Sequence, residues 1–275
     1  MTRVLSGATL GAVVLALVWF SNATVLLAVA LGVGVLAFRE YSPLMRAVGA
    51  DVPELMTVIA TLATLVTIPF PYVALEAVVG VGVLLIALAA MDRVSQRSPT
   101  NGDDNGQMFQ SAIRGSAAGV LSMLYLGLPL GALVAIHVYG GRNAVLLLIA
   151  TIVVSDTAQY YVGRLTGRRP LAPRLSPNKT IEGALGGFVA APIFLYFAGP
   201  QLIPVARPLI IALLGIVLVA AGIVGDLFES MLKRAAGLKD SSSLIPGHGG
   251  VLDRIDALLF ATPVFYLYVR WVYTI

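Results

Sequence analysis

Long apolar runs recur along the whole sequence, and they constrain the fold more than any other feature. A helix needs about 20 apolar residues to cross roughly 30 Å of hydrocarbon. Because lipid cannot satisfy bare backbone N–H and C=O groups, the spanning elements of such a chain are helices. The mean hydropathy is +0.91 and only 12% of residues are charged, which excludes an ordinary soluble domain. We predict an all-α, polytopic integral membrane protein.

The number of apolar runs predicts about nine transmembrane helices, with eight to ten as the range because the second run is short. The first run leads directly into another hydrophobic stretch, so we expect it to be retained and not cleaved as a signal peptide. The nine runs cover residues 4–20, 24–38, 52–70, 73–91, 112–137, 143–163, 182–198, 207–233 and 257–275.

Residues 1–275 are expected to form a single membrane-embedded domain. We distinguish its N-terminal helices (1–91), its middle helices (92–150) and a catalytic region (151–275) that contains two long polar loops, 164–181 and 234–256.

Basic residues divide unevenly between the two sides of this topology. Fifteen of the eighteen lysines and arginines fall on one side, and only Arg142, Arg207 and Arg270 fall on the other. Since short cytoplasmic loops are enriched in Lys and Arg, we expect a cytoplasmic N-terminus, a C-terminus outside and a location in the cell membrane. The net charge is +4, but the sequence contains no soluble basic domain, so nucleic-acid binding is disfavoured. The absence of cysteine excludes disulfides and thiolate metal sites.

Ionisable residues inside apolar runs are costly, and they mark functional sites or buried ion pairs. The sixth run carries the polar stripe "SDTAQYY", from Ser155 to Tyr161, and the eighth carries "GDLFESMLKR". Asp226 lies in the eighth run, and Asp253 and Asp256 stand where the ninth helix begins. Three carboxylates from two helix ends can converge, and hard oxygen ligands suit Mg²⁺. We therefore predict a Mg²⁺ site; for Glu229, Lys233 and Arg234 a structural ion pair remains the alternative.

The two polar loops carry groups that can bind phosphate. Glycines around His248 allow backbone N–H groups to approach phosphate oxygens, although a glycine-rich turn is a weak signal by itself. In the other loop, Thr180 is a candidate helix cap with Glu182 in the first turn, and helix N-termini attract anions. The cationic and hydroxyl donors of these loops are Arg168, Arg169, Arg174, Lys179, Lys233, Arg234, Lys239, Ser241, Ser242, Ser243 and Arg254.

The segment "SMLKRAAGLKDSSSLIPGHGGVLDRID", Ser230 to Asp256, resembles the signature of phosphatidate cytidylyltransferases, also called CDP-diacylglycerol synthases. The segments "SDTAQYYVGRLTGRR" and "LSPNKTIEGALGG" also resemble that family, so the resemblance covers about residues 155 to 260. It implies a membrane enzyme that joins CTP to phosphatidate and releases pyrophosphate, with Mg²⁺, with K⁺ as an additional ion reported in relatives, and with a homodimeric assembly.

The resemblance also implies roles for individual residues. Asp226, Asp253 and Asp256 correspond to the acidic metal-site residues, and His248 is expected either to donate to a phosphate or to make a structural hydrogen bond. The expected catalytic residues are Asp226, Asp253, Asp256, Lys233, Arg234 and Lys239. The expected substrate-binding residues are Ser176, Asn178, Lys179, Thr180, Arg174, Ser230, His248, Gly249, Gly250 and Arg254.

Three other functions remain open at the level of the sequence. Secondary transporters also place acidic residues near glycines on broken helices, although here the charges gather at one rim of the membrane. A CTP-dependent lipid-alcohol kinase would release CDP in place of pyrophosphate. A CDP-alcohol phosphotransferase is weaker, because its aspartate-rich Asp-Gly, Ala-Arg block is missing.

Overall fold

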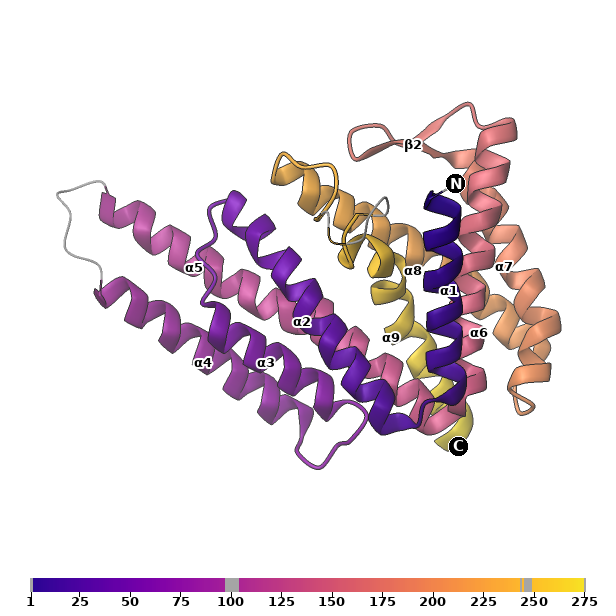
Figure 1. Cartoon of the computed structure of the whole chain (residues 1–275), viewed down its shortest axis with the longest axis horizontal. Helices are drawn as coiled ribbons and strands as arrows, with labels where there is room; N and C mark the ends of the chain where they lie inside the picture. The colour runs from indigo at the N-terminus through magenta and orange to yellow at the C-terminus, as the bar shows by residue number, and fades with distance from the viewer. Residues whose placement is uncertain (1, 97–103, 243, 245–248, 275) are drawn as a thin grey trace.

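The protein is a bundle of long helices with one small hairpin of strands at one end (Figure 1). The structure, a computed structural model, describes residues 2–96, 104–242, 244 and 249–274. Its helices are α1 (Thr2–Phe20), α2 (Ala23–Ala47), α3 (Glu54–Thr67), α4 (Leu75–Gln96), α5 (Asp104–Ser122), the π-helix η1 (Met123–Gly127), α6 (Leu128–Thr166), α7 (Ile181–Leu202), α8 (Pro208–Ala235) and α9 (Leu252–Thr274).

The all-α membrane class is confirmed in its coarse form, and the count of nine spans stays a prediction. Six helical segments of the described chain are long and apolar enough to cross a membrane, whereas Gly11–Phe20 and Glu54–Thr67 are shorter apolar helices. One of the six, Asn105–Thr166, has 62 residues and would be roughly 93 Å long at 1.5 Å per residue, which is more than one crossing requires.

A break at Gly141 divides that long segment. Gly141 has φ 70° and ψ −175°, a conformation that side-chain-bearing residues rarely adopt. The predicted runs 112–137 and 143–163 fall on either side of this break, which is a kink within α6. The N- and C-termini lie at opposite ends of the bundle (Figure 1).

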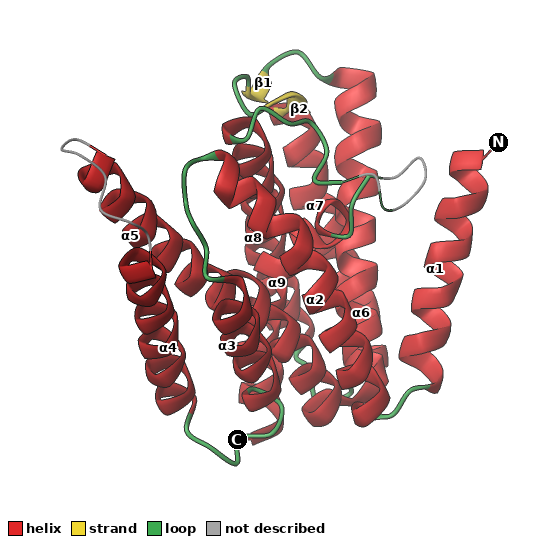
Figure 2. Ribbon diagram, turned by 60° about the vertical axis from the view of Figure 1, so that its left-hand side comes forward, coloured by secondary structure: helices red, strands yellow, loops and turns green. Residues whose placement is uncertain are grey.

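The N-terminal half packs directly onto the C-terminal half through α2. One apolar core cluster joins Tyr41 and Leu44 of α2 to Leu126 of η1, Leu232 of α8 and Leu252 of α9. A second cluster joins α6, α7, α8 and α9. Helix α2 lies beside the central helices, whereas α1 stands apart at the edge (Figure 2). The ends of α8 and α9 are therefore held from two sides.

The loop 164–181 contains strands that the sequence analysis did not predict. Strand β1 (Pro170–Ala172) pairs antiparallel with β2 (Ser176–Thr180), with Pro170 opposite Thr180 and Ala172 opposite Ser176. The all-α expectation missed this hairpin because three to five residues carry too little apolar alternation to reveal strands. The predicted cap is confirmed, since Thr180 Oγ1 accepts a hydrogen bond from Gly183 N at 3.1 Å. Glu182 ties the hairpin to α7 by accepting from Arg168 N and Arg169 N.

Candidate active site

A cavity of about 580 Å³ lies where the hairpin meets α6, α7 and α8. This size lies within the range of small-ligand pockets. The first turn of α7, a helix end of the kind that favours anions, contributes Gly183 and Ala184 to the cavity wall. The polar side chains on its wall include those of Asp156, Gln159, Ser176, Asn178, Lys179 and Asp226.

An ion pair between Lys179 and Asp226, which we call the cavity pair, crosses this cavity from β2 to α8. About a quarter of the Lys179 side chain and a third of the Asp226 side chain are exposed (24% and 34%). Ser230 Oγ lies 3.5 Å from Asp226 Oδ1, one helical turn along α8. Asp156 and Asp256 both lie within electrostatic range of Lys179 and Asp226. Three carboxylates therefore lie near Lys179, and Arg164 adds a second cation to the cavity wall.

This donor set fits a magnesium ion that shares its coordination with a ligand. In the described chain, no group of three or more Asp, Glu, His or Cys side chains forms a ready-made metal cage. Mg²⁺ does not need such a cage, since it is commonly bound by one or two carboxylates together with water and substrate phosphates. Asp156 and Asp226 both line the cavity and supply the hard oxygen atoms that Mg²⁺ prefers.

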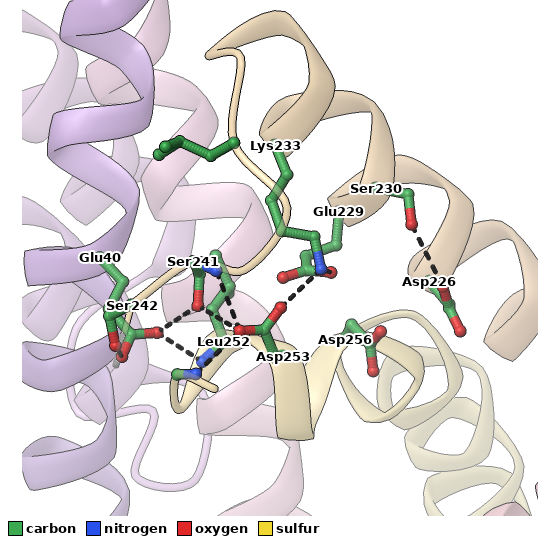
Figure 3. A network of polar contacts seen from close by, with 12 residues as sticks. Glu40, Asp226, Glu229, Ser230, Lys233, Ser241, Ser242, Leu252, Asp253 and Asp256 are labelled. Carbon is green, nitrogen blue, oxygen red and sulfur yellow. Dashed lines mark hydrogen bonds and ion pairs between the residues drawn. The ribbon is translucent and has the colours of Figure 1, made fainter. Parts of the chain in front are cut away.

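A second ion pair, Lys233–Asp253, which we call the buried pair, joins α8 to the first turn of α9 (Figure 3). Lys233 Nζ lies 2.5 Å from Asp253 Oδ1 and also pairs with Glu229, which is only 1% exposed. Asp253 Oδ2 lies 3.0 Å from Ser241 N, 2.8 Å from Ser241 Oγ and 2.8 Å from Gly250 N. Both carboxylate oxygens of Asp253 thus already have donors. The structural ion pair that the sequence left open for Lys233 and Glu229 is present.

The three aspartates expected to share one metal ion make different contacts. Asp253 faces Lys233 and Ser241, while Asp226 faces Ser230 (Figure 3). Asp226 also pairs with Lys179 of β2. Asp256 Oδ1 accepts from Ala257 N at 2.7 Å and lies in electrostatic range of Asp226. The single three-aspartate cluster is therefore not formed in this arrangement. The physical reason is that Lys233 and the backbone N–H groups of Ser241 and Gly250 draw the Asp253 carboxylate into the α8–α9 junction.

The remaining predicted site residues divide between the cavity and the outer surface. Ser176, Asn178, Lys179 and Thr180 line the cavity as a group, since β2 carries all four. Gly249 and Gly250 lie against Asp253 and not against the cavity. His248 lies outside the described residues. Four exposed predicted residues, Arg174, Arg234, Lys239 and Arg254, do not lie on the described cavity wall.

The predicted site residues did not include several side chains that the structure brings to the cavity or to the α8–α9 junction, among them Asp156, Glu229 and Glu40. Asp156 lines the cavity. Its position within an apolar run marks it as a candidate to bind a second cation or to pair with a lysine from a neighbouring helix end. Glu40 of α2 accepts hydrogen bonds from Ser241, Ser242, Val251 and Leu252 (Figure 3). Little in the sequence marks Glu40, which lies beside Arg39 and two residues beyond the apolar run 24–38.

Comparison of the sequence with known proteins identifies its family. A model of the cytidylyltransferase family matches residues 1–272. Similar proteins include phosphatidate cytidylyltransferases from Haemophilus influenzae, 44% identical over 131 residues (46% of each chain), and from Pseudomonas aeruginosa, 50% identical over 123 residues (43% of this chain and 45% of that one). The uncharacterized protein YnbB of Escherichia coli is 43% identical over 135 residues (49% and 45%). These matches span about half the length of each relative. Since the family match extends over nearly the whole sequence, the chain belongs to the cytidylyltransferase family.

Proposed function

We propose that this protein transfers a cytidylyl group from CTP to phosphatidate, giving CDP-diacylglycerol and pyrophosphate for phospholipid synthesis. The observation that carries the proposal is the cavity, which combines Lys179, hydroxyl and amide donors and carboxylates at one end of a membrane-type helix bundle. The relatives named phosphatidate cytidylyltransferase support the choice of substrates. In this proposal residues 1–275 act as one membrane-embedded domain, with the catalytic region in 151–275.

The reaction forms one bond and breaks one. A phosphate oxygen of phosphatidate attacks the α-phosphorus of CTP, and the bond from that phosphorus to the bridging oxygen breaks, so that pyrophosphate leaves with the electron pair. Because the attacking oxygen is already anionic, neutralising charge matters more than removing a proton. Mg²⁺, when bound, supplies positive charge that offsets the repulsion between the two anionic substrates.

The residues of the chain then bind and orient the two anions. Lys179 would leave Asp226 and donate to a phosphate, since a cation at a cavity wall can exchange one anionic partner for another. Ser176 and Asn178 on β2 would donate hydrogen bonds beside it, at the N-terminus of α7. Asp226 and Asp156 would hold the Mg²⁺. The buried pair would fix the α8–α9 junction without touching the substrate.

The substrates also determine where the site must lie. CTP arrives from water while the acyl chains of phosphatidate remain in lipid, so the cavity is proposed to open at the cytoplasmic face of the membrane. The N-terminus, which lies at the same end as the hairpin, would then be cytoplasmic and the C-terminus outside (Figure 1). A homodimer, and K⁺ as an additional ion, belong to the same proposal.

Product analysis tests this function directly. Purified protein in mixed micelles would receive CTP labelled at the α-phosphate, phosphatidate and Mg²⁺. We expect labelled CDP-diacylglycerol and one equivalent of pyrophosphate, and we expect both to disappear when EDTA removes the metal. CDP release with a diacylglycerol acceptor would instead indicate a lipid-alcohol kinase. Solute flux into liposomes without any lipid product would indicate a transporter.

A further inference from the structure

Glu40 on α2 is a buried carboxylate that receives hydrogen bonds from a loop 200 residues away. Its side chain accepts from Ser241 Oγ at 2.9 Å, Ser242 Oγ at 2.7 Å, Val251 N at 2.9 Å and Leu252 N at 2.8 Å. The residue is only 6% exposed. A carboxylate this buried is costly unless donors compensate its charge, and here they do.

These bonds serve the start of α9. The first N–H groups of a helix have no partner within the helix, and Glu40 satisfies those of Val251 and Leu252. Ser241 lies between Glu40 and Asp253, with its hydroxyl 2.9 Å from the first carboxylate and 2.8 Å from the second. Since Ser241 N already donates to Asp253, the single hydroxyl hydrogen is available to Glu40. Glu40 thus connects directly to the partners of Asp253.

The glycines of the motif are explained by the same contact. A Cβ added to Gly250 would collide with Ser241 Oγ and with the carboxylate of Glu40. Gly249 has φ +78°, and a Cβ there would lie 2.7 Å from Asp253 Oδ2. Such close approach requires residues without a side chain. The glycine pair therefore fits a turn that is closed around two carboxylates, one from α2 and one from α9.

We propose that Glu40 is a positioning residue for the reaction. It holds the start of α9 against α2, while Lys233, paired with Glu229 within α8, holds α8 against α9 through Asp253. Together these contacts fix the spacing between Asp226 on α8 and Asp256 on α9. Residues 1–150, which the motif resemblance does not cover, would in this way contribute to catalysis. The inference rests on the proposed function, because its kinetic effect is measured on cytidylyl transfer.

Kinetics of matched variants give the first test. Glu40→Gln keeps the size of the side chain, but its amide NH₂ would face donors, so kcat should fall about 10- to 100-fold, as is typical when a supporting group is removed. Glu40 is not on the cavity wall, so KM for CTP should change by less than about threefold. Glu40→Asp keeps the charge and should recover part of kcat. Glu76→Gln removes the same charge from an exposed position on α4 and serves as the control.

A label reports the position of the loop without turnover. The chain has no cysteine, so Leu244→Cys, at an exposed residue two positions after Ser242, accepts a single spin label. We expect Glu40→Gln to make this label more mobile in the electron paramagnetic resonance spectrum, and Glu76→Gln to leave it unchanged. The proposal is overturned if Glu40→Gln leaves both the spectrum and kcat unchanged. It is also overturned if the substitution raises KM for CTP and leaves kcat unchanged.

The proposal can still be tested if Glu40→Gln does not fold or if the parent protein is inactive. If Glu40→Gln does not fold, Ser242→Ala takes its place, because it removes one donor to Glu40 and leaves the bonds from Val251 and Leu252. We then expect a smaller fall in kcat at constant KM. An unchanged kcat in Ser242→Ala contradicts the proposal. If the parent protein makes no CDP-diacylglycerol, the proposed function fails while the label still decides whether Glu40 anchors the loop: mobility gained in Glu40→Gln supports the anchor, and an unchanged spectrum overturns it.

Discussion

The cavity pair and the buried pair have the same chemistry and opposite surroundings. Lys179 and Asp226 are 24% and 34% exposed on the wall of a cavity, whereas Lys233 and Asp253 are 12% and 7% exposed and surrounded by further polar partners. A partly exposed pair contributes little to stability and can exchange a partner for a ligand. A buried pair cannot lose one member without leaving an uncompensated charge. We therefore expect the cavity pair to take part in ligand binding and the buried pair to hold the α8–α9 junction.

The largest expected effect comes from Lys233→Met. This substitution leaves Glu229 and Asp253 facing each other without their cation, so it should destabilise the folded protein by about 3–5 kcal/mol. Thermal and denaturant unfolding of the purified protein in detergent measure the change. Lys239→Met, at an exposed lysine four residues beyond the end of α8, is the control and should change stability by less than about 0.5 kcal/mol. Equal stability of the two variants would break the assignment of the buried pair.

Asp226→Asn tests the opposite assignment for the cavity pair. The substitution removes a carboxylate from the cavity while preserving its shape, so kcat for cytidylyl transfer should fall about 10²- to 10³-fold, the loss typical of one preorganised electrostatic group. Stability should fall by less than about 1 kcal/mol, because the pair is partly exposed. Initial rates and unfolding midpoints are measured on the same preparation. A variant that keeps full turnover while losing stability would reverse the roles of the two pairs.

The sequence predicted the fold class because membrane helices have a simple signature. Each of the nine apolar runs overlaps a helical segment, and the break at Gly141 separates two of them. The hairpin β1–β2 could not be predicted from a local sequence pattern. Its pairing of Pro170 with Thr180 is accompanied by hydrogen bonds from the backbone of Arg168 and Arg169 to the side chain of Glu182 on α7. The N-cap at Thr180 could be predicted, because a cap is a contact between residues three apart.

The sequence pointed to aspartates and basic residues, but it did not predict which of them lie together in the structure. Asp226, Asp253 and Asp256 are close along two connected elements, and charge alone suggested that they meet at one ion. The orientation of Asp253 depends on Ser241, Gly250 and Lys233 together, and that geometry is not visible in spacing. Glu40 is 200 residues away, so only the three-dimensional structure brings it to the loop.

Gly250→Ala sharpens the comparison at the closed turn. Its Cβ would overlap Ser241 Oγ and the Glu40 carboxylate, so the expected destabilisation is about 1–3 kcal/mol, as for other overpacked sites. Gly80→Ala is the control, since Gly80 lies on helix α4 with nothing within 4 Å of its added Cβ. That control should be neutral or stabilising by up to about 1 kcal/mol. Unfolding in detergent measures both, and a tolerated Gly250→Ala would mean that the turn is not closed around Glu40.

The smallest expected effect concerns Tyr125, which lies between the surroundings of the two ion pairs. It is within electrostatic range of Glu229 and Asp253 at the buried pair and of Asp256 near the cavity pair. Its ring packs on Phe228 and Phe260, and its buried hydroxyl has no hydrogen-bond partner among the described residues. Tyr125→Phe should therefore change stability by less than about 1 kcal/mol, in either direction, because an unpaired buried hydroxyl contributes no bond.

Tyr41→Phe is the matched substitution, since the Tyr41 hydroxyl donates to Ala118 O at 2.8 Å and should contribute about 0.5–1.5 kcal/mol. Denaturant unfolding of the two variants side by side measures the difference. If Tyr125→Phe costs as much as Tyr41→Phe, the Tyr125 hydroxyl has a partner in solution. A bound water or ion would then link the two assemblies, and the separation between an exchangeable pair and an architectural pair would not hold.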